Sequence, residues 1–359
     1  MIQHRLAALR ALMDESRTDA ILVTKYVNLQ YFSGFRGDDT TLVVTKDRAC
    51  LVTDNRYTEQ AALQAPDYEI VEQKKGLWTR TAELIRALGV RNVGFEGSVL
   101  SFNHYRVMKK LLGSAVRFET SVNLDPLRQV KDAEELRFIR EACRIADAAF
   151  EAVRSYMKVG MTEVQVAAYL ERVMREQGSE KPSFDTIVAS GLRGSMPHGT
   201  ATEKKLEAGD FVTMDYGAKY QGYCSDITRT VVMGKVDARQ REVYEAVLDT
   251  QEKVLADIGP GKSGREIDAR SRENLRRYGL DTYFGHGLGH SLGLEIHEEP
   301  RLSPSSTCES LVPGMLITDE PGVYLPGWGG LRIEDTVLVT ATGSERLTKS
   351  QKNLIEIPQ

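Results

Sequence analysis

The sequence is poor in cysteine, and the four cysteines that it has include no CxxC pair. A structural zinc site built from thiolates is therefore excluded. In a chain of 359 residues, four scattered cysteines predict reduced and mostly buried thiols, and hence a protein of a reducing compartment such as the cytoplasm. The four are Cys50, Cys143, Cys224 and Cys308.

Long hydrophobic runs and basic stretches are also missing. The first twenty residues have no apolar core of signal-peptide length, and no later segment approaches a membrane span, so we expect no membrane association. The formal net charge is -4 with both signs mixed along the chain, which makes nucleic acid an unexpected partner. No glycine-rich loop with a lysine is present to hold a phosphate. What remains is an ordinary globular composition, 41% hydrophobic and 27% charged, in a chain long enough for two domains.

The first 125 residues alternate strand-like and helical segments. Short β-branched runs at 19–24, 40–45 and 49–54 predict strands, and the patterns at 79–89 and 103–113 predict helices that end at glycine. Strands that alternate with helices indicate a small α/β domain, for which we expect the bounds 1–125. The polar segment 123–135, which contains a proline, is the expected linker.

The remainder, 126–359, shows the order helix, helix, strands twice over. Capping-box pairs predict helix starts after Asp132, Thr162 and Ser263, and the first helix is expected to end at Gly160. Strand-like runs follow each helix pair, at 211–217 and 225–234 and again at 315–324 and 331–340. A duplicated unit of this kind predicts one curved sheet with helices on its outer face and a concave face free for chemistry.

Acidic residues interrupt these apolar strands, where an unpaired carboxylate is costly to bury. Asp215 and Asp226 are eleven residues apart, and a turn near 220–221 would place them on one side of a hairpin. Two carboxylates held that close repel each other unless a proton or cation lies between them. The alternative is that both are exposed strand residues that face water.

The second half repeats the pattern and adds histidine. Glu320 and Glu334 interrupt its two apolar runs. Four of the six histidines in the chain occur in SMPHGT and GHGLGHSLGLEIHEEP, a concentration that random placement rarely produces. These four are His198, His286, His290 and His297.

Four carboxylates and one histidine form a hard, oxygen-rich ligand set. Such a set suits a pair of Mn, Co or Fe ions better than a structural zinc. Two such ions lower the pKa of a shared water and polarise the carbonyl that it attacks, so the pattern predicts a hydrolase without specifying the bond.

The ordered segments DYG, SDITRT, GHGLGHSLGLEIHEEP, DEPGVY and RIED resemble the pita-bread metallopeptidases, which include methionine aminopeptidase, aminopeptidase P and prolidase. The resemblance covers about residues 130–359. The N-terminal part resembles the non-catalytic domain of the aminopeptidase P, prolidase and creatinase branch, which methionine aminopeptidases normally lack. The implied fold is an α/β N-terminal domain followed by an α+β pita-bread catalytic domain with pseudo-duplicated halves.

The resemblance implies a dinuclear metal site. Asp215 would bind one ion, Asp226 and Glu334 would bridge both, and His290 with Glu320 would complete the second. Manganese or cobalt is favoured, with zinc or iron as alternatives. All five ligands are present, whereas the metal-free relative creatinase lacks the full set.

The same resemblance assigns substrate-side roles. Glu320 would carry the proton from the water to the leaving nitrogen, and His198 and His297 would stabilise the tetrahedral intermediate. His286 resembles a further substrate-side histidine of the proline-specific members. Asp319 departs from the hydrophobic residue usual before that glutamate; we expect it to point away from the metals, although it could perturb Glu320.

Within this branch, the sequence favours an Xaa-Pro dipeptidase (prolidase) over aminopeptidase P, which acts on longer peptides. A dipeptidase must capture a free carboxylate, for which Arg301 is the first candidate and Arg332 the second, the alternative for Arg301 being a solvated loop residue. Short proline-containing peptides are thus the expected substrates, and the family implies a homodimer. Two other readings are a non-catalytic pita-bread module that binds histones or RNA, and phosphoester hydrolysis as a side activity.

Overall fold

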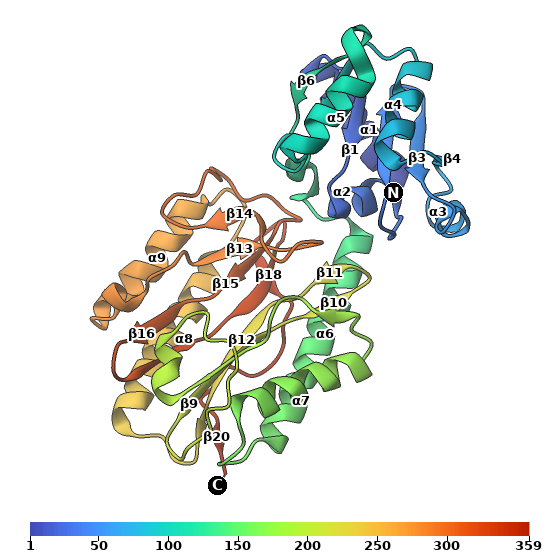
Figure 1. Ribbon diagram of the computed structural model, residues 1–359. Helices are drawn as coiled ribbons and strands as arrows, with labels where there is room; N and C mark the ends of the chain where they lie inside the picture. The colour runs from blue at the N-terminus through green and yellow to red at the C-terminus, as the bar shows by residue number, and fades with distance from the viewer. Residues whose placement is uncertain (359) are drawn as a thin grey trace. The chain divides into compact units, whose positions relative to one another are not determined.

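The computed structural model describes residues 1–358 and consists of two compact units, Met1–Arg128 and Gln129–Gln359 (Figure 1). The division lies three residues beyond the expected boundary at 125. Each unit has its own buried core, so each is described by itself.

The first unit is built on a six-stranded sheet in the order β4-β3-β2-β1-β5-β6. The expected strands are found: β1 pairs antiparallel with β2 on one side and parallel with β5 on the other. The two expected helices, α4 and α5, contribute Ile85 and Met108 to the apolar core. The elements are α1 (Ile2–Ser16), β1 (Ala20–Val23), α2 (Tyr26–Ser33), β2 (Thr41–Thr45), β3 (Ala49–Thr53), α3 (Thr58–Gln64), β4 (Glu69–Glu72), α4 (Leu77–Ala87), β5 (Asn92–Phe95), α5 (Phe102–Leu112) and β6 (Arg117–Ser121).

The second unit begins with the predicted helices. Capping boxes start α6 (Ala133–Tyr156), α7 (Glu163–Glu176) and α9 (Gly264–Arg277) at the expected residues, and α8 (Ala238–Asp257) also begins at one. The prediction that the first helix ends at Gly160 is wrong: the helix stops at Tyr156, because Met157 takes an extended conformation and turns into the core.

Two sets of strands follow the two helix pairs, as the duplicated pattern predicts. β20, β12, β9 and β8 form one sheet, and β15, β18 and β19 form another. Helices α6 and α7 pack on the first set, and α8 and α9 contribute to the core of the second (Figure 1). A bridge between Thr228 and Glu334 joins the sets, so the pita-bread architecture with pseudo-duplicated halves is confirmed. The strands are β8 (Ile187–Ser190), β9 (Phe211–Tyr216), β12 (Ile227–Met233), β15 (Leu316–Asp319), β18 (Asp335–Val339), β19 (Ser344–Arg346) and β20 (Glu356–Ile357).

Three of the four acidic residues lie at breaks between strands, which corrects the expectation that they interrupt continuous strands. The run 315–324 divides at Glu320 into β15 and β16, and the run 331–340 divides at Glu334 into β17 and β18. Asp226 comes directly before β12, and only Asp215 lies inside a strand. The breaks at Glu320 and Glu334 free these two side chains from strict alternation. The remaining short strands are β7 (Lys181–Pro182), β10 (Ala218–Tyr220), β11 (Tyr223–Cys224), β13 (Gly289–Ser291), β14 (Glu298–Leu302), β16 (Gly322–Leu325) and β17 (Gly329–Arg332).

Among residues 1–358, no helix has the length and apolar character needed to cross a membrane. The four cysteines are unpaired, and three of them are buried.

Candidate metal centre and substrate pocket

The first two carboxylates are brought together by a hairpin. β9 pairs antiparallel with β12 so that Asp215 lies opposite Thr228. The chain reverses at Gln221 and Gly222, which both have positive φ as a tight hairpin turn requires. Asp226, two residues before Thr228, therefore projects from the same face of the hairpin as Asp215. Both are buried, so the alternative of two exposed strand residues is wrong.

The other candidate ligands converge on this pair from the second half of the unit. One ligand atom each from Asp226, His290 and Glu334 lies within 4.8 Å of the other two. Nε2 of His290 is 3.6 Å from Oδ2 of Asp226 and 3.4 Å from Oε1 of Glu320. Nδ1 of His290 lies 3.0 Å from the carbonyl oxygen of Ser291, an arrangement that directs the Nε2 lone pair at the carboxylates.

The electrostatics of this cluster fit a cation. Burial and then repulsion by neighbouring carboxylates raise the pKa of Asp226 and of Glu334 well above the ordinary range, and burial raises the pKa of Glu320 to about 7. Oδ1 of Asp215 and Oδ1 of Asp226 are buried with no hydrogen-bond partner among the described residues. Burial and neighbouring His297 lower the pKa of His290 to about 3, so its imidazole is neutral and able to ligate. Divalent cations would satisfy these oxygens and reverse the repulsion.

Arg332, the second candidate for a substrate clamp, is already engaged. Its guanidinium forms a short ion pair with Asp215, donates to the Tyr324 hydroxyl at 2.7 Å, and donates through Nε to Oγ1 of Thr228 at 3.1 Å. The side chain is buried. With most of its donors occupied, Arg332 is placed to orient Asp215 and has little capacity left to fork onto a substrate carboxylate.

The three substrate-side histidines differ in how firmly hydrogen bonds hold their rings and in how exposed they are. His286 is held at both ring nitrogens, 2.7 Å from the carbonyl oxygen of Gly287 and 2.9 Å from the hydroxyl of Tyr324, and burial lowers its pKa to about 4. His198 and His297 are exposed. The ring of His297 packs edge-on against His290 at 4.5 Å, and partial burial followed by the charge of Arg301 lowers the pKa of His297.

Arg301 lies beside the candidate metal ligands. In the β13–β14 pair it is directly opposite His290, so both side chains share one face. The Arg301 side chain is 51% exposed, and its ion pair with Glu299 at 3.5 Å is long. Its guanidinium therefore remains available to a ligand.

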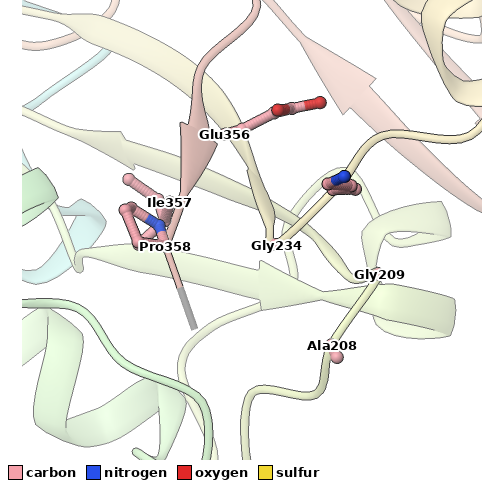
Figure 2. A pocket seen from close by; sticks show the side chains of 7 residues that line it. Ala208, Gly209, Gly234, Glu356, Ile357 and Pro358 are labelled. Carbon is pink, nitrogen blue, oxygen red and sulfur yellow. The ribbon is translucent and has the colours of Figure 1, made fainter.

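All ten residues predicted from the sequence as ligands, acid-base groups or substrate contacts line a single pocket of about 680 Å³. A second pocket, along the C-terminal strand β20, contains none of them (Figure 2). The first pocket is therefore the candidate active site. The ten are His198, Asp215, Asp226, His286, His290, His297, Arg301, Glu320, Arg332 and Glu334.

The residues that support the ligands were missed by sequence reasoning. Thr228 donates to Oε2 of Glu334 at 2.6 Å, and Thr318 donates to Oε1 of Glu320 at 3.0 Å. A signal was available for Thr228, a polar strand residue two positions after Asp226. Asp319 does not line the pocket; it is fully buried on β15, with burial and Asp335 raising its pKa.

A buried carboxylate holds the loop that carries His198. Glu163, the first residue of α7, is fully buried and accepts hydrogen bonds from both ends of this loop. At one end Ser190 donates through its backbone N and its hydroxyl, both at 2.8 Å, and Nε of Arg193 donates at 3.0 Å. At the other end Thr202 donates through its backbone N at 3.1 Å and its hydroxyl at 2.7 Å.

We expect Glu163→Ala to destabilise the protein and lower its activity together. The change leaves several buried donors unpaired, which should cost about 3 kcal/mol of unfolding free energy. Denaturant unfolding and peptide hydrolysis measure the two effects. Glu203→Ala, at an exposed position in the same segment, is the control and should stay within about 0.5 kcal/mol of wild type. Equal stability of the two variants would contradict the role given to Glu163.

Comparison with known proteins matches both units. The model of metallopeptidase family M24 matches residues 137–341, and that of the creatinase/prolidase N-terminal domain matches residues 5–139. An Xaa-Pro dipeptidase of Pyrococcus furiosus is 40% identical over 99% of this chain and 100% of its own length. Among solved structures, an Xaa-Pro dipeptidase from Bacillus anthracis has a TM-score of 0.96 at 43% identity, covering 99% of each chain. An X-Pro aminopeptidase from Thermotoga maritima MSB8 has a TM-score of 0.92 at 35% identity, covering 98% of this chain and 100% of that one.

Proposed function

The chain belongs to metallopeptidase family M24, and from that premise we propose that it is a dinuclear-metal Xaa-Pro dipeptidase. The observation that carries the proposal is the pocket in which four carboxylates and His290 converge beside the available guanidinium of Arg301. The ligand set supports hydrolysis, and the arginine supports recognition of a free carboxylate. The full-length likeness to two Xaa-Pro dipeptidases agrees with both.

Five residues would hold the metal pair. We propose that Asp215, Asp226, His290, Glu320 and Glu334 would hold the two ions, with manganese or cobalt favoured over zinc or iron. When bound, two divalent ions supply a water of lowered pKa and polarise the carbonyl of the scissile bond.

The remaining steps belong to side chains of the chain itself. Glu320 takes a proton from the attacking water and delivers it to the proline nitrogen as the carbon–nitrogen bond breaks. His198 and His297 stabilise the negative charge that develops on the carbonyl oxygen. His286, which also lines the pocket, is held by the Tyr324 hydroxyl and keeps a fixed orientation toward the substrate.

Hydrolysis of Ala-Pro and of Ala-Pro-Leu by protein stripped of metal and then loaded with Mn or Co tests the proposal. Metal-dependent cleavage of the dipeptide alone is the expected result. Preference for the tripeptide would make the protein an aminopeptidase P, the alternative that the Thermotoga maritima structure supports. Cleavage of neither peptide would contradict the proposed function and favour a non-catalytic module.

The Arg301→Ala variant should lose activity on dipeptides selectively. Removing a charge-assisted hydrogen bond to the substrate carboxylate should lower kcat/KM for Ala-Pro about 10- to 150-fold, chiefly through KM. Ala-Pro amide, which has no carboxylate, is the matched substrate and should be cleaved equally well by wild type and variant. An equal loss on both substrates, or an unchanged KM for Ala-Pro, would remove Arg301 from this role.

Two broader proposals accompany the activity. The unpaired cysteines support a cytoplasmic enzyme, and cell fractionation that placed it elsewhere would contradict this. The resemblance to the prolidase branch supports a homodimer, and a monomer by light scattering would refute it.

A further inference from the structure

Apart from the candidate metal ligands, few charged residues line the pocket, and they differ in whether a partner within the protein already neutralises them. Three charged side chains remain in its lining: Arg301, Arg332 and Asp185. Arg332 is neutralised by Asp215, and most of its other donors are occupied. The pocket therefore presents one available positive group, Arg301, and one further negative group, Asp185.

Asp185 reaches the pocket from the irregular segment 183–186, which connects β7 to β8. The backbone N of Ser183 donates to the carbonyl oxygen of Gly217 at 2.8 Å, and Ile187 lies opposite Asp215. Residues 184–186 belong to no strand and connect these two points, whereas the facing segment spans them with the single residue Tyr216. Extra residues at such a break redirect side chains, as β-bulges do next to active sites. Here two of the three residues, Phe184 and Asp185, line the pocket.

The carboxylate of Asp185 has no partner within the protein. It is exposed, and it makes no hydrogen bond or ion pair with any residue of the described range 1–358. Other acidic side chains of the same region are paired, as Glu163 is with Arg193 and Asp210 is with Lys204 at 2.7 Å. An unpaired carboxylate in a pocket that already holds four others adds repulsion that a cationic ligand group would relieve.

We propose that Asp185 receives the α-ammonium group of the dipeptide while Arg301 receives its carboxylate. This inference rests on the proposed function, whose substrate is a zwitterion with one charge of each sign at its two ends. Asp185 and Arg301 supply one complementary charge each. The apolar side chains of Phe184, Ile187 and Ile296 line the pocket with them and offer contacts to the uncharged parts of the dipeptide.

The assignment has a consequence for substrate choice. Asp185 becomes a specificity-determining residue that favours peptides with a free amino terminus. Its contribution is that of a partly solvated ion pair, so it acts on affinity more than on the rate of bond cleavage.

The test compares two substrates that differ only in the ammonium group, Ala-Pro and its des-amino analogue propionyl-proline. With the Mn-loaded enzyme, we expect Asp185→Asn to lower kcat/KM for Ala-Pro about 5- to 30-fold and to change that for propionyl-proline less than about twofold. Glu252→Gln, at an exposed position on α8, is the matched control and should leave both substrates at wild-type values.

Equal losses on the two substrates would show a general disturbance of the pocket and overturn the inference, as would an unchanged kcat/KM for Ala-Pro. Failure of the proposed function is a separate result, in which wild-type protein cleaves neither Ala-Pro nor Ala-Pro-Leu. In that case calorimetric binding decides: Asp185→Asn must weaken the Kd for Ala-Pro and leave that for propionyl-proline unchanged, or the inference is wrong.

Discussion

The Asp226→Asn variant is expected to lose at least about a thousandfold in kcat/KM for Ala-Pro, since a metal-assisted reaction draws several kcal/mol of transition-state stabilisation from its ions. Asp226 lies within 4.8 Å of His290 and Glu334 through one ligand atom of each. An amide at this position offers one neutral oxygen in place of a charged, two-oxygen carboxylate. We therefore expect the purified variant to retain fewer than two metal ions per chain.

Without bound metal, the Asp226→Asn change should not weaken the protein but leave its stability equal or higher. Burial and repulsion by Glu334 and Asp215 raise the pKa of Asp226, so its ionised form destabilises the folded protein when no cation is present. Asn removes that charge, and the stripped variant should be at least as stable as stripped wild type at neutral pH. Thermal unfolding with and without Mn measures the effect of the change on stability in the metal-loaded and in the metal-free protein.

Asp257→Asn is the matched control, because Asp257 is an exposed residue at the end of α8 with only a long ion pair. It should keep wild-type activity, metal content and stability. Two bound metals and activity within tenfold of wild type in Asp226→Asn would contradict the proposed ligand set.

The second large effect is expected in stability. Arg229 is 1% exposed and uses every donor of its guanidinium. Nη2 donates to Oδ1 of Asp335 at 2.7 Å and to the carbonyl oxygen of Ser350 at 2.8 Å, while Nε donates to the carbonyl oxygen of Gln351 at 3.1 Å. Nη1 donates to the carbonyl oxygen of Glu334, at the break between β17 and β18. Arg229 thus connects strand β12, a candidate metal ligand and the C-terminal segment.

Arg229→Met should lower the unfolding free energy by about 3–5 kcal/mol, because Asp335 loses a buried partner and several carbonyl groups lose their donors. For a unit of this size the melting temperature should fall by about 6–20 °C. Calorimetry of the metal-free protein measures the effect without a contribution from bound ions.

The control is Arg241→Met on helix α8. Arg241 is exposed, and its ion pair with Glu245 at 3.9 Å is long, so this change should stay within about 0.5 kcal/mol of wild type. A melting temperature for Arg229→Met no lower than that of Arg241→Met would show that the buried network does not contribute as argued.

Local rules predicted the helices well because a capping box is a local structure. Asp132 with Glu135 and Thr162 with Gln165 each exchange two hydrogen bonds within four residues, and the helices begin where these pairs stand. The strands were predicted less well at their ends. Ile317 and Val323 belong to one apolar run in the sequence but to separate strands, β15 and β16, because the chain breaks at Glu320.

For the site too, local features could be predicted from the sequence, whereas long-range contacts could not. The sequence alone indicated the ligand types, since acidic residues in apolar strands and clustered histidines are chemically unfavourable without a function. It also indicated that Asp215 and Asp226 share one face, because a hairpin and strand alternation are local geometry. Long-range partners were not visible: Arg332 orients Asp215 across 117 positions, and Arg229 contacts Asp335 across 106.

What the sequence determined by itself was therefore the chemistry: a hard ligand set, a duplicated framework to hold it, and an arginine near it. Only the tertiary structure decided which charges remain available. Arg301 and Arg332 look alike in sequence, yet Arg332 is neutralised by Asp215 while Arg301 faces the pocket. Asp185 is one acidic residue among 51, and the irregular segment between β7 and β8 brings it into the pocket without a partner. The reason is physical: a charge is available to a substrate only if the fold leaves it unpaired, and pairing depends on residues distant in the chain.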